Sequence, residues 1–483
     1  MMYMSKISRI FTGTAIAALL VCGCEKESGS AGMTDADVIT IFEVDTESNL
    51  KNPYTGWTLY CPFADMPRAY WAKVSEVAEK YAGTLYIRWT WADMEPEEGR
   101  YAWDMNEKFI QFVEGARERG LRLCFRVYVD SYAQGKNATP QWVLDHARSY
   151  EPNGSNGGYL TPYGDDPYFL EKYTKFIEAF GKKFNDPALV DYVDSYGLGF
   201  SGEENNIRWY NQDNALDAFS TIVRAYEKAF DKVINVVNYG KSTEEAAIVY
   251  DELGFSTRRD GFCSHWFPES DQIAFSGLFP DQMLVGEACY SSDYDFATAE
   301  NGKWGTWENY SRDLVEMALN THVNYLDLRD AATALKWLEL NPEGVRRFLA
   351  QGGYRIYPAE VRYKTEGDKV IVQHSWHNYG TGVLPNNNRH LNYKYRIALG
   401  LFDSSGELVS RTLSDGIEVS SLVNGAQLQA TDEISLNALA PGSYRLGIAI
   451  VNTLENDSKD ITLAVKDATK ITGEYVYAGD IEI

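Results

Sequence analysis

The feature that most constrains the fold is a regular alternation of strand-like and helix-like segments between residues 52 and 328. Runs rich in Val, Ile, Tyr, Trp and Phe predict strands, and longer segments with apolar residues at helical spacing predict amphipathic helices. The predicted strands cover residues 52–60, 84–91, 121–129, 193–205, 233–239, 261–267, 283–287 and 323–328, with helices such as 70–81, 167–184, 215–230 and 307–320 between them. This order predicts an α/β fold, a closed (β/α)8 TIM barrel. An open doubly wound sheet would normally carry a glycine-rich phosphate turn after its first strand, and the sequence has none there.

The pattern changes after about residue 353. Segments that alternate or cluster as strands follow one another, separated by turn sequences such as residues 403–406 and 440–442, and helical periodicity is absent. Many short strands with turns between them are typical of a β-sandwich. We therefore predict a barrel over residues 37–355, followed by a C-terminal antiparallel β-sandwich over residues 356–483.

The N-terminus predicts an export signal. Basic residues precede the apolar stretch 15–21, which is too short to span a bilayer. The sequence Val21-Cys-Gly-Cys24 resembles a bacterial lipobox, which implies a lipoprotein signal peptide over residues 1–23 and a lipid on Cys24. Residues 24–36 are polar and predict a tether. We expect a protein anchored in the cell envelope at the outer membrane, periplasmic or surface-exposed; a plain secretory signal cut elsewhere is the alternative.

Composition limits the classes of partner. A net charge of −24 argues against nucleic acid, which requires a basic surface. Six histidines without metal-ligand spacing and six cysteines without a C-x-x-C pair predict no metal, and we expect no cofactor. The 33 tyrosines and 12 tryptophans favour a carbohydrate ligand, because flat amphipathic rings stack on sugar faces. The lipid anchor is the only membrane contact that we predict.

Glutamates follow two of the predicted strands. Glu203 and Glu204 come after the fourth strand, and Glu287 ends the seventh. Because reacting groups in such barrels come from the C-terminal ends of the strands, these carboxylates are expected to meet. One carboxyl group that donates a proton and a second that attacks or stabilises the sugar cation are what cleavage of a glycosidic bond needs. We predict Glu203 as general acid and base, with Glu204 as the alternative, and Glu287 as nucleophile.

Other motifs carry a resemblance. The passage Trp89–Asp104 and the segment Pro140–Leu144 look like those of bacterial β-galactosidase-type enzymes in the large clan of retaining glycoside hydrolases with barrel folds. The resemblance implies a glycoside hydrolase that retains configuration, with Arg88 near the nucleophile. One departure is Gly202, since the clan usually has Asn immediately before the acid. Gly-Glu in this place is closer to uncharacterised Bacteroidetes barrel lipoproteins.

Aromatic and polar side chains at the ends of these strands are candidate substrate-binding residues. Besides Arg88 and Glu204 they are Trp89, His265, Trp266, Tyr290 and Trp304, although each aromatic ring has core packing as an alternative. A non-catalytic glycan-binding lipoprotein that uses the barrel cleft is the rival function. Gly202 favours that rival, and the paired glutamates oppose it.

Overall fold

The computed structural model describes residues 38–483, except 62, 133, 153–156, 455–456 and 458. The predicted signal peptide, the tether and Cys24 lie outside the described residues. Within the part of the chain that is described, no helix is both long and apolar enough to cross a membrane.

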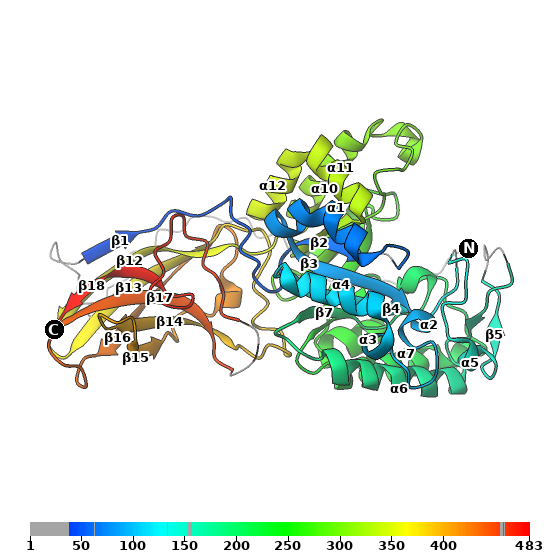
Figure 1. The fold of residues 1–483 in the computed structure, drawn as a ribbon, viewed down its shortest axis with the longest axis horizontal. Coiled ribbons are helices and arrows are strands. Elements are labelled where there is room, and N and C mark those ends of the chain that lie inside the picture. The colour runs from blue at the N-terminus through cyan, green and yellow to red at the C-terminus, as the bar shows by residue number, and fades with distance from the viewer. Residues whose placement is uncertain (1–37, 62, 133, 153–156, 455–456, 458) are drawn as a thin grey trace, which may run out of the picture. The chain divides into compact units, whose positions relative to one another are not determined.

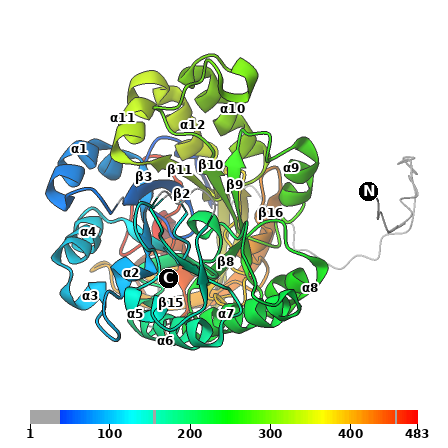
Figure 2. The same cartoon turned by 90° about the vertical axis from the view of Figure 1, so that its right-hand side faces the viewer.

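Eight parallel strands within the described residues close into a barrel, which confirms the predicted fold class (Figure 2). Consecutive strands pair, and the last strand closes on the first. The barrel strands are β2 (Gly56–Cys61), β3 (Ala82–Thr90), β4 (Arg122–Tyr128), β7 (Val190–Asp194), β8 (Ile234–Asn238), β9 (Ser256–Phe262), β10 (Leu284–Ala288) and β11 (Tyr325–Arg329).

Helices surround this ring of strands, as Figure 2 shows. The longer helices are α1 (Pro67–Lys80), α4 (Glu107–Glu118), α6 (Pro167–Phe184), α7 (Ala215–Ala229), α9 (Glu269–Ser276), α10 (Trp307–Asn320), α11 (Ala331–Leu340) and α12 (Pro342–Gln351). Short helices are α2 (Trp91–Met94), α3 (Ala102–Met105), α5 (Gln141–Leu144) and α8 (Thr243–Ala246), which continues as a π-helical turn over Ala247–Glu252.

Helix α6 illustrates why these segments form where the sequence predicts them. The Asp166 carboxylate accepts hydrogen bonds from the N–H groups of Tyr168 and Phe169, and Pro167 occupies the first turn, where its missing N–H has no cost. Apolar side chains recur at helical spacing and are buried, among them Phe169, Tyr173, Phe176, Ile177 and Phe180. The capped start and the apolar face together fix the helix against the barrel.

The fourth and sixth predicted strands differ from the structure by more than a shift of a few residues at their ends. The fourth barrel strand ends at Asp194, and the remainder of the predicted segment 193–205 is a loop with positive φ at several positions. The sixth strand is β9, over Ser256–Phe262, whereas the prediction placed it at residues 261–267. Residues 256–260 include two arginines and an aspartate, which do not look like a buried strand. Arg258 is nevertheless fully buried because carboxylates surround it inside the barrel.

The described part of the C-terminal region contains two four-stranded antiparallel sheets, in agreement with the predicted class (Figure 1). One sheet has the order β1-β12-β13-β16 and the other β15-β14-β17-β18. Their strands are β1 (Val38–Ile41), β12 (Ile356–Glu366), β13 (Lys369–Asn378), β14 (Tyr395–Phe402), β15 (Leu408–Leu413), β16 (Gln427–Ser435), β17 (Ser443–Asn452) and β18 (Val476–Glu482); a small hairpin in the barrel region joins β5 (Ser149–Tyr150) to β6 (Thr161–Pro162). Strand β1 lies in the predicted barrel range 37–355 but pairs with β12, so that range is corrected for this strand.

Candidate active site

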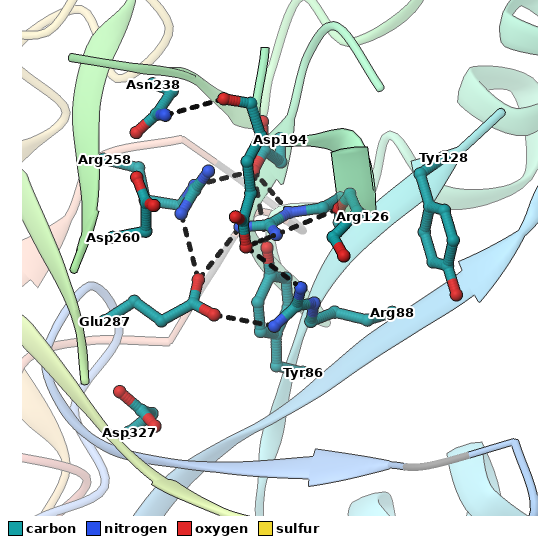
Figure 3. A network of polar contacts seen from close by, with 12 residues as sticks. Tyr86, Arg88, Arg126, Tyr128, Asp194, Asn238, Arg258, Asp260, Glu287 and Asp327 are labelled. Carbon is teal, nitrogen blue, oxygen red and sulfur yellow. Dashed lines mark hydrogen bonds and ion pairs between the residues drawn. The ribbon is translucent and has the colours of Figure 1, made fainter. Parts of the chain in front are cut away.

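Arginine side chains from three other barrel strands hold Glu287 near the end of β10 (Figure 3). Arg88 Nη1 on β3 lies 2.6 Å from Glu287 Oε1, and Arg126 Nη2 on β4 lies 3.0 Å from Oε2. Arg258 Nη1 on β9 lies 2.9 Å from the same Oε2. The Glu287 side chain is only 4% exposed, so these ion pairs provide most of its polar surroundings.

Glu203 shares two of these arginines with Glu287. It lies in the loop after β7, and its Oε1 is 3.3 Å from Arg88 Nη2 and 3.2 Å from Arg126 Nη1. Each of these guanidinium groups therefore contacts both carboxylates, one through each terminal nitrogen. The structure thus brings together the glutamates that the sequence assigned to the fourth and seventh strands. Arg88 lies next to Glu287, as expected, and contacts Glu203 as well.

Glycine is required at position 202, directly before Glu203, because neighbouring side chains occupy the place of a Cβ. Gly202 has φ of 72°, and a Cβ added there would lie 2.8 Å from the Cβ of Tyr128 and 3.1 Å from the Cδ of Arg126. An asparagine would be strained and would clash with the arginine that contacts both carboxylates. Gly202, which stands where the clan usually has Asn, therefore leaves the room that the Arg126 side chain occupies.

The surroundings shift the pKa values of the two carboxyl groups in opposite directions. Burial raises the pKa of Glu203, the charge of Glu287 adds to this rise, and Arg126 and Arg88 oppose it. Burial would also raise the pKa of Glu287, but Arg88, Arg126, Arg258 and Arg329 hold it well below its usual range. Glu287 is therefore the carboxylate that stays ionised, and Glu203 is the one that can carry a proton.

Asp194, the last residue of β7, pairs with two of the arginines that contact Glu287. Its Oδ2 accepts a hydrogen bond from Arg126 Nε at 2.8 Å and pairs with Arg258 Nε at 2.9 Å. Asp194, Arg126 and Arg258 are all fully buried. Because buried guanidinium groups need buried anions, this carboxylate holds both arginines in the geometry that reaches Glu287.

Asp194→Asn should destabilise the fold by about 3–5 kcal/mol, because it removes one partner from a buried charge network. The measurement is urea-induced unfolding at neutral pH. Glu171→Gln is the control, since Glu171 forms an exposed pair with Lys175 on α6 and its removal should leave the unfolding midpoint unchanged. Equal midpoints for Asp194→Asn and the unsubstituted chain would contradict this role of Asp194.

Glu204 has a different environment from Glu203. Its Oε1 accepts a hydrogen bond from the backbone N–H of Asn238 at 2.6 Å, and its Oε2 forms an ion pair with Lys241. Burial raises the pKa of Glu204 and Lys241 opposes this rise. Asn238 Nδ2 also donates to the backbone carbonyl of Glu203 at 2.8 Å, so the end of β8 anchors both glutamates. Since Glu203 shares its arginines with Glu287, these contacts favour Glu203 over Glu204 as the acid.

The glutamates line a cavity of about 630 Å³ at the C-terminal ends of the strands, a size typical of small-molecule sites. Glu203, Glu204 and Glu287 all contribute to its wall. Other charged, polar and aromatic residues that line it include Asn238, Lys241, Arg259, Asp260, Trp266, Asp271 and Arg329. The cavity therefore combines an aromatic ring with donors and acceptors, as a sugar-binding site requires.

Trp266 is placed as a sugar platform would be. It lines the cavity and is 58% exposed. Its backbone is held on both sides, because Arg259 donates to its carbonyl and its own N–H donates to Ser264 Oγ at 3.3 Å. Neighbouring His265 pairs through Nδ1 with Glu300 at 2.9 Å and is not among the described residues that line the cavity. Both residues lie in the loop after β9, not at the end of a strand as predicted.

The remaining aromatic candidates pack inside the protein. The Trp89 indole donates to the carbonyl of Cys61 at 3.2 Å, and its ring packs against Phe63 and Phe109. Tyr290 and Trp304 are also buried, and they donate to the carboxylates of Glu300 and Asp313 at 2.5 and 3.0 Å. The prediction that these rings contact substrate is corrected: their alternative, core packing, is what the structure shows.

Sequence reasoning missed Arg126, Asp194, Arg258 and Lys241. A signal was present, because Arg122 and Arg126 interrupt a mostly apolar strand-like run, where a buried charge must find an opposite charge. The identity of the partner was not readable, since it depends on which strands become neighbours and which side chains point inward.

No protein-family model and no curated protein matches the chain. Among solved structures, the chain is similar to a lactosyl-enzyme intermediate of endo-glycoceramidase II from Rhodococcus sp., with 12% identity, 82% of this chain and 99% of that chain covered, and a TM-score of 0.40. It is also similar to a GH30 endoxylanase from Clostridium papyrosolvens, with 10% identity, 82% of this chain and 98% of that chain covered, and a TM-score of 0.36. For a glycoside hydrolase family 5 enzyme from Prevotella bryantii, the identity is 12%, 64% of this chain and 100% of that chain are covered, and the TM-score is 0.38. The barrel itself is established by the pairing of this chain's own strands.

Proposed function

We propose that the chain hydrolyses a glycosidic bond of an oligo- or polysaccharide, with Glu203 as general acid and base and Glu287 as nucleophile. One observation carries the proposal: two carboxyl groups that line one cavity share Arg88 and Arg126, yet their pKa values are shifted in opposite directions. A protonated acid beside an ionised carboxylate is the division that glycoside cleavage uses.

The proposed reaction has two steps. A Glu287 oxygen attacks the anomeric carbon while Glu203 gives its proton to the departing glycosidic oxygen, which leaves a glycosyl ester on Glu287. Glu203, now ionised, then takes a proton from water as the water oxygen attacks the same carbon, and the ester bond to Glu287 breaks. Each carboxyl group ends in the state in which it started.

Retention of configuration is part of this proposal. Retaining enzymes place the carboxyl groups about 5–5.5 Å apart, whereas inverting enzymes leave about 6.5–9.5 Å for a water molecule. Here the same two guanidinium groups contact both Glu203 and Glu287, which supports the closer arrangement. The clan resemblance at Trp89–Asp104 implies the same outcome.

The test is a screen of aryl glycosides and plant or host glycans for release of reducing ends. We expect at least one sugar to be cleaved, with the first-formed product, followed by NMR, having the anomeric configuration of the substrate. Glu203→Gln/Glu287→Gln double-substituted protein is the control for contaminating hydrolases. Cleavage that persists in this control would come from a contaminating hydrolase or from another site, and not from these two glutamates.

A non-catalytic glycan-binding protein is the second candidate. The observation in its favour is the engagement of Glu287 by Arg88, Arg126 and Arg258, because a carboxylate with so many ion pairs is a weaker nucleophile. Calorimetric titration of the same glycans distinguishes the two functions. Binding without release of reducing ends across the screen would select the binding function.

We also propose that a lipid on Cys24 anchors the chain at the outer membrane. The lipobox-like sequence and the polar segment after it support this address. Cys24→Ala should abolish partition into detergent on phase separation and leave the protein unprocessed or released, since a thioether-linked lipid needs the cysteine sulfur. Cys61→Ala is the matched control, because this cysteine is buried in the barrel. Recovery of unmodified protein with an intact Cys24 in the soluble periplasm would contradict the anchor.

A further inference from the structure

Asp327 on β11 contacts the strand end that carries Glu287. Its Oδ1 accepts a hydrogen bond from the backbone N–H of Ala288 at 2.6 Å, and its side chain is 3% exposed. Ala288 is the residue directly after Glu287, so this bond holds the peptide that follows the proposed nucleophile. Figure 3 draws Asp327 beside Glu287, from the neighbouring strand.

Arg329 holds the next two peptides of the chain through their carbonyl groups. Its Nη2 donates to the carbonyl of Cys289 at 3.1 Å and also to the carbonyl of Ala288. Its Nε lies 3.4 Å from Asp327 Oδ2, so the two side chains form an ion pair. Arg329 has a positive φ of 55°, a conformation that a non-glycine residue adopts only when its surroundings hold it there.

We propose that Asp327 is a positioning residue for Glu287: with Arg329 it holds the peptides after the nucleophile, and its negative charge keeps Arg329 in place. The inference rests on the proposed function for its catalytic meaning. Asp327 is not among the described residues that line the cavity, and by this proposal it does not touch the substrate. It acts through the backbone of Ala288 and through Arg329, which does line the cavity.

With this arrangement, the loss of activity at low pH is expected to follow the protonation of Asp327. Burial raises the pKa of Asp327 to about 6, Arg329 opposes the rise and the charge of Glu287 adds to it. The titratable and charged groups that face Asp327 from the surrounding strands are Tyr60, Tyr86, Tyr192, Arg258, Glu287, Tyr325 and Arg329. Above about pH 6 Asp327 is ionised and holds Arg329, and activity falls as the pH drops through that value. Glu287 cannot cause this limb, because its own pKa is held well below the usual range.

Asp327→Asn is the discriminating substitution. An asparagine keeps an oxygen that accepts the Ala288 N–H but has no charge and no titration. We expect kcat to fall about 10- to 100-fold, the loss typical of a misplaced catalytic group, with KM nearly unchanged. The limb near pH 6 should disappear. The control is Asp330→Asn, three residues further on, where the side chain caps α11 and asparagine caps equally well. A limb that stays near pH 6 with an unchanged kcat in Asp327→Asn would overturn the proposal.

A second measurement does not require turnover. Isotope-edited infrared or carbon NMR titration of the Asp327 carboxyl should give a pKa near 6 in the unsubstituted chain and a lower value in Glu287→Gln, because the neighbouring negative charge is then gone. An identical pKa in both proteins would overturn the coupling. If the unsubstituted chain cleaves no glycan, the proposed function fails, whereas this titration still decides whether Asp327 responds to Glu287.

Discussion

Glu287→Ala is expected to abolish hydrolysis of every glycoside, lowering kcat by about 10⁴- to 10⁶-fold, since it removes the group that forms the covalent intermediate. The loss should be the same for good and poor leaving groups. Azide is small enough to enter the space that the side chain leaves and should restore turnover, giving a glycosyl azide of inverted configuration. The measurement is the initial rate with and without azide, together with NMR of the product.

Glu204→Gln is the matched control for this substitution. It removes the charge of another glutamate that lines the cavity but retains an oxygen that can accept from the Asn238 N–H. We expect it to lack azide rescue and to keep substantial activity with all leaving groups. Near-normal rates in correctly folded Glu287→Ala would show that Glu287 is not the nucleophile.

Glu203→Ala should separate substrates by their leaving groups. Dinitrophenyl glycosides need little protonation and should be cleaved at nearly the original rate in the first step. Substrates with sugar leaving groups should lose about 10²- to 10⁴-fold, the usual contribution of a general acid. Azide should here give a product of retained configuration, because it replaces water in the second step.

The pH dependence gives an independent check on Glu203. Burial and Glu287 raise the pKa of Glu203, so the acid is protonated at low pH and activity falls as the pH rises through that pKa. This basic limb should be absent in Glu203→Ala and present in Glu204→Gln. A basic limb that persists in Glu203→Ala would assign the proton to another group.

Much of the fold could be predicted from the sequence because most barrel strands and helices here follow apolar periodicity. Helix α10 has the predicted bounds, and its apolar face is buried. The position of β9 was predicted wrongly because Arg258 and Asp260 interrupt the apolar pattern. The charges are tolerated in the strand only because Asp194 and Glu287 lie opposite Arg258, a fact of tertiary pairing. Residues 38–41 do form a strand, but their inclusion in the barrel range was wrong for a related reason, since the partner strand β12 lies more than three hundred residues later.

The candidate site could be predicted in part. Glu203, Glu287 and Arg88 follow or end strands, a position that local sequence indicates. The exposure of Trp266 and the burial of Trp89 and Trp304 depend on how the loops fold over the barrel, and sequence does not distinguish them. The role of Gly202 is readable only once Arg126 is seen in the space where a side chain would lie.

The most direct test is peptide mass spectrometry of the protein after turnover of an activated 2-deoxy-2-fluoro glycoside of the sugar found in the screen. The fluorine slows both steps, and the activated leaving group lets the first proceed, so the intermediate accumulates. The proposed mechanism predicts a single glycosyl adduct on the peptide that contains Glu287, lost on incubation with an acceptor sugar. An adduct on Glu203 or Glu204, or cleavage of the parent substrate with inverted configuration and no adduct, would contradict it.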